Sequence, residues 1–386
     1  MIAFMNGWRG RLRRGKARPA DAEGPESYEV ASQWQLMWWK FKKHRMAMFA
    51  GVVLILLYLM AVFCEFLSPS LPLTRYTEYK NAPPSKIRFV DPESGFSLRP
   101  FVYDIKQQID KETFRRTFVE DTSKKYPIHF FVRGETYKFW GLFETNVHLF
   151  GLKEGSGPLF LMGTDDLGRD LFTRILYGAR ISLSFGLIGI VFTLILGLLL
   201  GGLSGYLGGV VDTIIQRLID LLMSKPTIPL WMALAAALPK DWTPLQIYLG
   251  MVLIMSIIGW TGLARVVRGK MLSLREEDFT MAARLAGASD MRIITKHLLP
   301  SFASYIIVNV TLSIPATILG ETSLSFLGLG LQPPVVSWGV LLQSAQNLET
   351  LAHHPWLLWP AAFIVVTVLM FNFLGDGLRD AADPYK

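Results

Sequence analysis

The chain has 386 residues, of which 51% are apolar and only 18% are charged. Typical soluble domains carry about 25% charged residues, and here the apolar residues gather into long continuous runs. The net charge of +8 does not indicate nucleic-acid binding, because the excess of Lys and Arg lies beside these runs. The composition therefore predicts an all-α polytopic membrane protein.

Residues 1–46 form a polar, basic segment with ten Lys or Arg and four acidic residues. Three tryptophans, Trp34, Trp38 and Trp39, alternate with lysines near its end. Two interpretations fit this pattern: a segment lying at the membrane interface, or the ordinary basic flank of a first membrane helix. Both place this end of the chain in the cytoplasm.

Six apolar runs are long enough to cross a bilayer, since a helix needs about 20 residues to span roughly 30 Å. The third run is the weakest, because Arg217, Asp220 and Lys225 interrupt it together with two prolines. The sequence therefore predicts six transmembrane helices, near residues 47–67, 181–203, 212–236, 247–264, 304–326 and 356–375.

The distribution of Lys and Arg among the connections predicts the orientation. The connections assigned to the cytoplasm hold ten, none, seven and two such residues; they are 1–46, 204–211, 265–303 and 376–386. The short connections assigned to the outside, 237–246 and 327–355, hold one and none. Because positively charged loops remain in the cytoplasm, we expect both termini on the cytoplasmic side of the bacterial inner membrane.

A long segment, residues 68–162, follows the first run and shows no helical periodicity. We interpret it as a small extracytoplasmic insert of β character. Residues 128–132 and 136–143 are rich in aromatic and β-branched side chains, and Arg133-Gly134-Glu135 separates them. This pattern predicts a β-hairpin that turns at Gly134.

The first strong motif opens the remaining segment, residues 163–386, just before the second run. Thr164 or Asp165 could cap a helix, and Asp170 and Arg174 are one turn apart, which predicts a short amphipathic helix on the outer membrane face. A metal site built from Asp165, Asp166 and Asp170 is the less favoured alternative, because arginines at 169 and 174 can neutralise the carboxylates. The motif comprises Gly163, Thr164, Asp165, Asp166, Leu167, Gly168, Arg169 and Asp170.

The second strong motif lies in the connection 265–303. Acidic residues 276–278 favour a helix start, and Gly287 favours its end. Ser289 is placed to cap a second helix, from Asp290 to Leu299, which Pro300 would stop. A short helix with two alanines and a terminal glycine permits close approach of a partner protein.

The second motif resembles the EAA loop of the permeases of bacterial ATP-binding-cassette (ABC) importers. The resemblance rests on Met281-Ala282-Ala283, Gly287 and His297-Leu298-Leu299-Pro300. Residues 163–170 are similar to the second permease of the oligopeptide, dipeptide and nickel group. Residues 205–212, 325–330 and 375–380 match that group as well, so the resemblance covers roughly residues 160–386 and the first run.

The resemblance implies a six-helix permease that forms half of a pore and works by alternating access. Its implied partners are a second permease, two ATPases and an extracytoplasmic substrate-binding receptor. The ATPase-docking role falls on Ala282, Ala283 and Gly287, with Arg284 as a polar contact. Met281 replaces the usual Glu, and His297 replaces an aliphatic residue. The long insert does not specify the substrate. Peptides are the favoured class, and oligosaccharides, opines or nickel complexes are the alternatives.

Two charged residues inside the runs are candidates for the translocation pathway. Lys225 in the third run either forms a structural ion pair with Asp220 or Glu321, or lines the path and meets an anionic group of the solute. Glu321, near the outer end of the fifth run, belongs either to an outer gate or to the hydrated interface.

The sequence lacks the motifs of a catalytic subunit. It has no Gly-x4-Gly-Lys-Ser/Thr phosphate loop, so ATP hydrolysis is expected in a separate subunit and no cofactor or metal is expected on this chain. Gly202-Leu203-Ser204-Gly205 is compatible with an intramembrane serine protease, but none of the six histidines lies in a run to act as base. We interpret these glycines instead as residues of close helix packing and a tight cytoplasmic turn. A passive channel would not need the ordered loop at 265–303.

Overall fold

The computed structural model describes residues 33–91, 95–109, 116–153, 155–239 and 241–383, so most of the basic segment, residues 1–32, lies outside the described part. Five helical stretches in this part are long and apolar enough to cross a membrane. They contain α3 (Arg45–Val62), α5 (Leu171–Leu207), α8 (Pro244–Leu274), α12 (Ala303–Phe326) and α15 (Trp359–Ala382).

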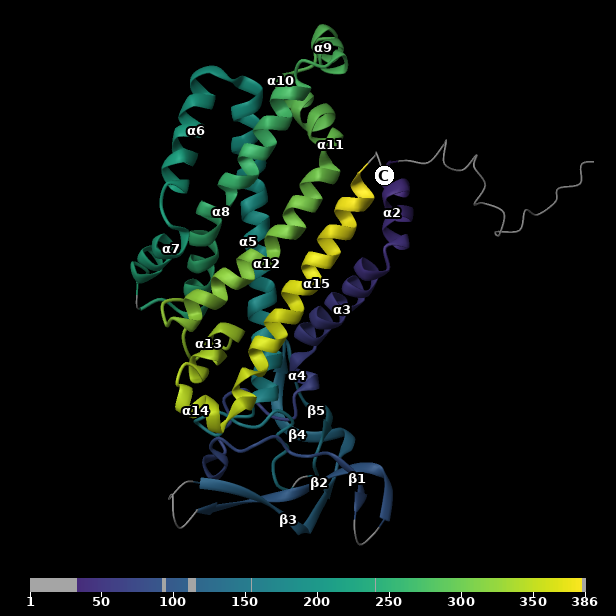
Figure 1. Ribbon diagram of the computed structural model, residues 1–386, viewed down its shortest axis with the longest axis vertical. Helices are drawn as coiled ribbons and strands as arrows, with labels where there is room; N and C mark the ends of the chain where they lie inside the picture. Colours follow the sequence, from purple (N-terminus) through teal and green to yellow (C-terminus); the bar gives the residue numbers. More distant parts are fainter. Residues whose placement is uncertain (1–32, 92–94, 110–115, 154, 240, 384–386) are drawn as a thin grey trace, which may run out of the picture.

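The predicted third span is bent into two short helices. α6 (Gly209–Met223) and α7 (Thr227–Ala236) meet at 88° across residues 224–226. Pro226 lies directly before α7, where its missing N–H and fixed φ end a helix readily. The pair takes the chain from one end of the bundle to the start of α8 (Figure 1), and counted as one span it completes the six that the sequence predicts.

The connections predicted to be cytoplasmic share one end of the bundle (Figure 1). This end carries α2 (Gln33–Lys43), the α5–α6 turn, α9 (Asp278–Leu285), α10 (Asp290–Arg292), α11 (Leu299–Ser301) and the last turn of α15. We call it the docking end. The insert lies at the opposite end, together with α13 (Trp338–Leu342) and α14 (Leu348–His353).

α5 packs closely on α8 because glycines line its contact face. A Cβ added at Gly201 would lie 2.5 Å from the carbonyl oxygen of Ala264, and one at Gly205 would lie 2.7 Å from that of Arg268. Gly208 and Gly209 then reverse the chain with φ of 66° and 56°. The predicted close packing is confirmed at Gly205, whereas the turn begins three residues later, because Gly202 and Gly205 both lie within α5.

The insert is built from β structure, as expected. β1 (Arg88–Asp91), β2 (Gly95–Ile109) and β3 (Arg116–Pro127) form an antiparallel sheet, and β4 (His129–Phe139) pairs with β5 (Phe143–Gly151). The predicted turn position is wrong, because residues 133–135 lie within β4. Gly134 instead lets the strand approach His148, whose ring a Cβ would meet at 2.9 Å, and the turn falls at Trp140 and Gly141, both with positive φ.

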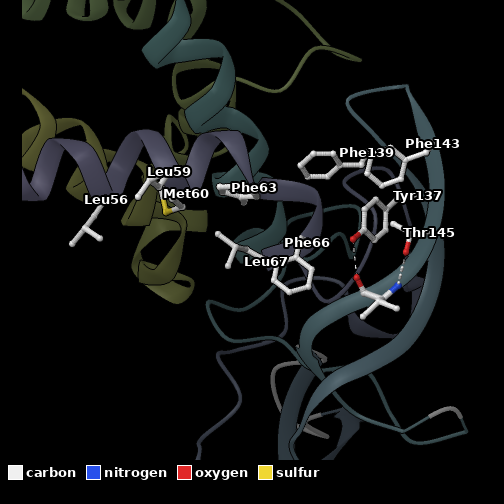
Figure 2. Close-up of a pocket in the computed structure, with 11 residues that line it drawn as sticks. Leu56, Leu59, Met60, Phe63, Phe66, Leu67, Tyr137, Phe139, Phe143 and Thr145 are labelled. Atoms are coloured by element: carbon white, nitrogen blue, oxygen red, sulfur yellow. Dashed lines mark hydrogen bonds between the residues drawn. The ribbon is translucent and has the colours of Figure 1, made fainter.

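The hairpin rests on the end of the first span. Trp140 Nε1 donates a hydrogen bond to the carbonyl of Val62 at 3.0 Å, and Arg180 of α5 lies over the Trp140 ring while it pairs with Glu65 of α4 (Cys64–Leu67). Figure 2 shows the apolar groove of about 780 Å³ at this junction. The apolar surface of α3 therefore continues directly onto the strands.

Candidate functional site

Helix α9 projects from the docking end of the bundle (Figure 1). It begins after Glu277, carries Asp278 in its first turn and Arg284 in its last, and ends before Gly287, whose φ is +78°. Opposite charges at the two ends complement the helix dipole, and glycine is favoured at that φ. The predicted short helix is confirmed.

One side of α9 is fixed to its own chain. The fully buried Thr280 donates a hydrogen bond from Oγ1 to the carbonyl of Leu274 at 2.8 Å. Ala283 packs against the apolar cluster that contains Tyr206, and the Arg284 guanidinium lies over the Tyr206 ring. Of the predicted docking residues, Ala283 therefore faces the bundle, and Arg284 reaches Tyr206 while it stays exposed.

The other side of α9 presents an apolar surface. Ala282 and Gly287 are exposed, and Leu285 is 88% exposed. Phe279, Met281 and the nearby Met291 are also exposed. The sequence did not mark Leu285 or Phe279, because a helix of eight residues is too short for its period to show which side meets the bundle.

The end of α8 that leads to α9 is hydrogen-bonded to the α5–α6 turn. Arg268 of α8 donates two hydrogen bonds to Asp212 of α6, at 2.5 and 2.6 Å. Ser204 donates to the same carboxylate and accepts from Gln216, so its hydroxyl is part of this structural network. No histidine among the described residues contacts Ser204, which leaves the protease alternative without a base.

The motif at 163–170 is a buried loop, and the predicted amphipathic helix is absent there. A β-bridge joins Thr164 to Asp170, and α5 begins directly at Leu171. Asp170 caps α5 by accepting the N–H of Thr173 at 2.9 Å, so neither Thr164 nor Asp165 is the cap. Burial raises the pKa of Asp170 to about 6.

Asp165 organises this loop. Its Oδ1 accepts the N–H groups of Leu167 and Arg169, and its Oδ2 accepts the side chains of Arg169, at 2.7 Å, and Arg174. The predicted Asp170–Arg174 pair is therefore an Asp165–Arg174 pair. Asp166 points to solvent, and no cluster of three His, Cys, Asp or Glu in the described segments could hold a metal ion.

The loop also clamps the chain that follows the first span. Thr164 accepts the N–H of Ala82 at 2.7 Å and donates to the carbonyl of Tyr79. Gly168 has a φ of +74°, and a Cβ there would lie 2.1 Å from the carbonyl oxygen of Tyr76. Gly163 likewise lies against the carbonyl of Ala82. These glycines are needed for the close approach of two backbones.

The two predicted pathway residues lie in different environments. Lys225 is exposed at the α6–α7 bend and forms no salt bridge with any described residue, while Asp220 pairs with Arg265 at 2.6 Å and Arg217 at 4.0 Å. Glu321 is fully buried and accepts hydrogen bonds from three serines, Ser182, Ser325 and Ser337. The suggested pairing of Lys225 and the hydration of Glu321 are therefore wrong.

The sequence of the chain matches two described families. Residues 193–385 match the binding-protein-dependent transport system inner membrane component, and residues 32–84 match the N-terminal TM domain of oligopeptide transport permease C. The first match spans half of the chain and includes α9. The chain belongs to this permease family.

Transport permeases of other bacteria are similar to this chain. The oligopeptide transport system permease protein OppC of Bacillus subtilis is 40% identical over 58% of this chain and 70% of its own. The glutathione transport system permease protein GsiD of Escherichia coli O1:K1 is 32% identical over 92% of each chain. An inward-facing structure of the MetNI methionine transporter is 17% identical and covers 54% of this chain and 95% of its own, with a TM-score of 0.42.

The permease is thus a membrane component of an ABC importer, and the relatives reported above are named as permeases. Members of this family work with an ATPase and a substrate-binding protein. The resemblance that the motifs indicated is confirmed, as is the α-helical membrane fold with its small β insert.

Proposed function

We propose that this permease forms half of the pore of an importer for peptides, with the docking end in the cytoplasm. The Lys and Arg of the connections gather at that end, and cytoplasmic loops carry this bias. Both termini would then be cytoplasmic, and the insert would face a substrate-binding receptor. A second permease completes the pore, and two ATPases supply the energy.

The exposed apolar side of α9 carries this proposal. A helix fixed on one side by Thr280 and Ala283 moves together with α8, to which Thr280 is bonded through Leu274. An ATPase that binds Ala282, Leu285 and Gly287 could therefore shift the ends of α5 and α8 when it closes. Such coupling changes the populations of outward-open and inward-open states, which is what alternating access requires.

Peptides are the proposed substrate because OppC and the dipeptide permease DppC of Bacillus subtilis, both 40% identical, and GsiD, 32% identical, are named for oligopeptide, dipeptide and glutathione transport. The substrate class is tested by measuring the uptake of a labelled tripeptide in the presence of unlabelled solutes. If an opine, oligosaccharide or nickel complex inhibits this uptake and unlabelled peptides do not, the substrate belongs to that other class.

The docking proposal is tested with Leu285→Glu in the complete importer. We expect loss of ATPase co-purification and of peptide uptake, while the thermal stability of the permease changes little because Leu285 is exposed. Leu348→Glu is the matched control, since Leu348 is 80% exposed on α14 at the opposite end. Normal ATPase binding in Leu285→Glu would refute the assignment of α9.

Orientation is tested separately by thiol labelling. The chain has one cysteine, the buried Cys64, so a Cys64→Ala, Ser289→Cys variant carries a single exposed thiol beside α9. We expect an impermeant maleimide to label it in inverted vesicles and not in intact spheroplasts. The reverse result would place α9 outside the cell.

A further inference from the structure

An unpaired amide lies inside the fifth span. Asn309 is six residues from the start of α12, or about 9 Å along the axis at 1.5 Å per residue. Its side chain forms no hydrogen bond with any described residue, and neither does the hydroxyl of Thr193 on α5. A polar group costs several kcal/mol in hydrocarbon. Both side chains therefore need water or a polar partner.

Two cavities meet at Asn309. The smaller, of about 240 Å³, lies between α5, α8 and α12 and is lined by Thr193, Gly262 and Ser313 among others. The larger, of about 590 Å³, extends toward the docking end past Ser304, Tyr305 and Lys270. Asn309 is the one lining residue that the two cavities share, and we call these neighbouring cavities together the Asn309 groove.

The surface of α12 is suited to such a groove. Tyr305, Asn309, Ser313 and Thr317 recur every four residues, so they are neighbours along the helix. Ser313 and Thr317 donate to the carbonyls four residues earlier, which satisfies their protons and leaves oxygen lone pairs for a solute. α12 is also the least apolar of the five long spans.

The glycines of α8 show that the groove is not filled by this chain. A Cβ at Gly259 would meet Thr193 Oγ1 at 3.1 Å, so this glycine allows close packing. A Cβ at Gly262 would meet nothing within 4 Å. Glycine costs a helix about 1 kcal/mol relative to alanine, and at Gly262 no packing within the chain offsets that cost. The space above Gly262 is thus open to something else.

We infer that the Asn309 groove is the wall that this permease contributes to the translocation path, in the half nearest the docking end. The inference rests on the proposed function and adds this groove to Lys225 and Glu321 as candidates for the path. An amide, hydroxyls and glycines offer hydrogen bonds without fixed charge, which suits the backbone of peptides with varied side chains. A dry helix–helix contact with the second permease is the competing arrangement.

Single-cysteine labelling separates the two arrangements. In a Cys64→Ala background, Gly262→Cys and Ser313→Cys are compared with Leu369→Cys, an exposed site on α15 that lines neither cavity. The probe is a charged, impermeant methanethiosulfonate applied to inverted vesicles that contain the whole importer. The reagent reacts with the thiolate form of cysteine, which forms in water, whereas lipid excludes both the thiolate and the charged reagent. We therefore expect the groove cysteines to react at least about tenfold faster than Leu369→Cys.

The same vesicles yield two further readouts. Modification at Gly262→Cys should block the ATP-driven release of tripeptide enclosed in the lumen, because import corresponds to release from an inverted vesicle, and saturating tripeptide should slow the labelling. Reaction no faster than at Leu369→Cys, or disulfide crosslinking of Gly262→Cys to a cysteine in the second permease without reagent access, would overturn the inference. If another solute slows the labelling and peptide does not, the groove would still belong to the path and only the proposed substrate would be wrong.

The role of the amide is tested with Asn309→Leu, which keeps the volume and removes the hydrogen bonds. We expect peptide uptake to fall about tenfold, as one hydrogen bond of roughly 1–1.5 kcal/mol implies, with unchanged amounts of assembled importer. Asn309→Ser, which restores a hydroxyl, should recover part of the rate. Equal uptake by Asn309→Leu and the parent would contradict a role in the path.

Discussion

The loop 163–170 and helix α9 are the two segments that the sequence marks most clearly, and they are built in opposite ways. In the loop, Thr164, Asp165 and Asp170 are at most 2% exposed, and their side chains bond to their own chain. On α9, Leu285 is 88% exposed and only one side of the helix is fixed.

The difference separates two reasons for a motif to exist. Buried carboxylates, arginines and glycines at positive φ hold a particular backbone arrangement, so the loop fixes the insert on α5. An exposed apolar surface on a short helix offers contacts to another protein. Substitutions in the loop should therefore lower the folding stability of the permease, whereas those on α9 should weaken the coupling between the ATPase and transport.

The largest stability effect is expected for Asp165→Ala. It leaves the guanidinium of Arg174, only 4% exposed, without its partner, and breaking a buried pair costs about 3–5 kcal/mol. The melting temperature of the purified permease in detergent measures this loss. Asp166→Ala, at the exposed neighbour, is the control and should stay within about 0.5 kcal/mol; similar melting of both variants would contradict the structural role.

Ala283→Glu should abolish peptide uptake without preventing membrane insertion. Ala283 is partly buried against the Tyr206 cluster, where a carboxylate would lose water without gaining a partner. We therefore expect α9 to detach from the bundle and become more sensitive to trypsin at Arg284 and Arg292. Ala282→Glu provides the contrast, because it lies on the exposed side: ATPase binding should weaken while trypsin sensitivity stays normal. If trypsin cleaves Ala283→Glu and Ala282→Glu equally, the assignment of Ala283 to the packed side of α9 and Ala282 to its exposed side is wrong.

Two glycines with nearly equal φ give the sharpest comparison. Gly168→Ala adds a Cβ that would lie 2.1 Å from a backbone oxygen, so strain and clash together should cost about 2–4 kcal/mol. Gly287→Ala meets nothing within 4 Å and should cost only the φ strain, about 1 kcal/mol. The melting temperatures of the two variants measure these losses of stability. A larger loss in Gly287→Ala than in Gly168→Ala would contradict the expected order.

The smallest effect is a pH dependence at Asp170. Burial raises the pKa of its carboxyl from 3.8 to about 6, so the folded state holds the proton more tightly than the unfolded state. Its contribution to stability is therefore present below pH 4 and is lost as pH rises through 6. Asp170→Asn keeps the cap without ionising, so its melting temperature should exceed that of the parent at pH 7.5 and approach it near pH 4.5.

If the melting temperature of the parent instead rises above that of Asp170→Asn at high pH, the ionised carboxylate stabilises the loop. In that case the hydrogen bonds from Thr173 would outweigh burial. The measurement thus distinguishes the two contributions at the residue that begins α5.

Local patterns in the sequence were sufficient for the apolar runs, for α9 ending before Gly287, for the glycine packing of α5 and for a hairpin in the insert. Each depends on neighbours within a few residues, such as a run of apolar side chains or a charge at a helix end. The family resemblance followed from the same local motifs.

Tertiary structure alone decided which partners the polar residues meet. Asp165, not Asp170, pairs with Arg174, because the backbone of residues 76–82 folds over the loop. Glu321 meets serines from α5 and from the start of α13, and Gly134 serves a contact with His148 rather than a turn. Some of these partners lie far away in sequence, as Ser182 does from Glu321 and Trp356 from Thr164. Arg174 lies only nine residues from Asp165, but no helix or strand period brings the two together.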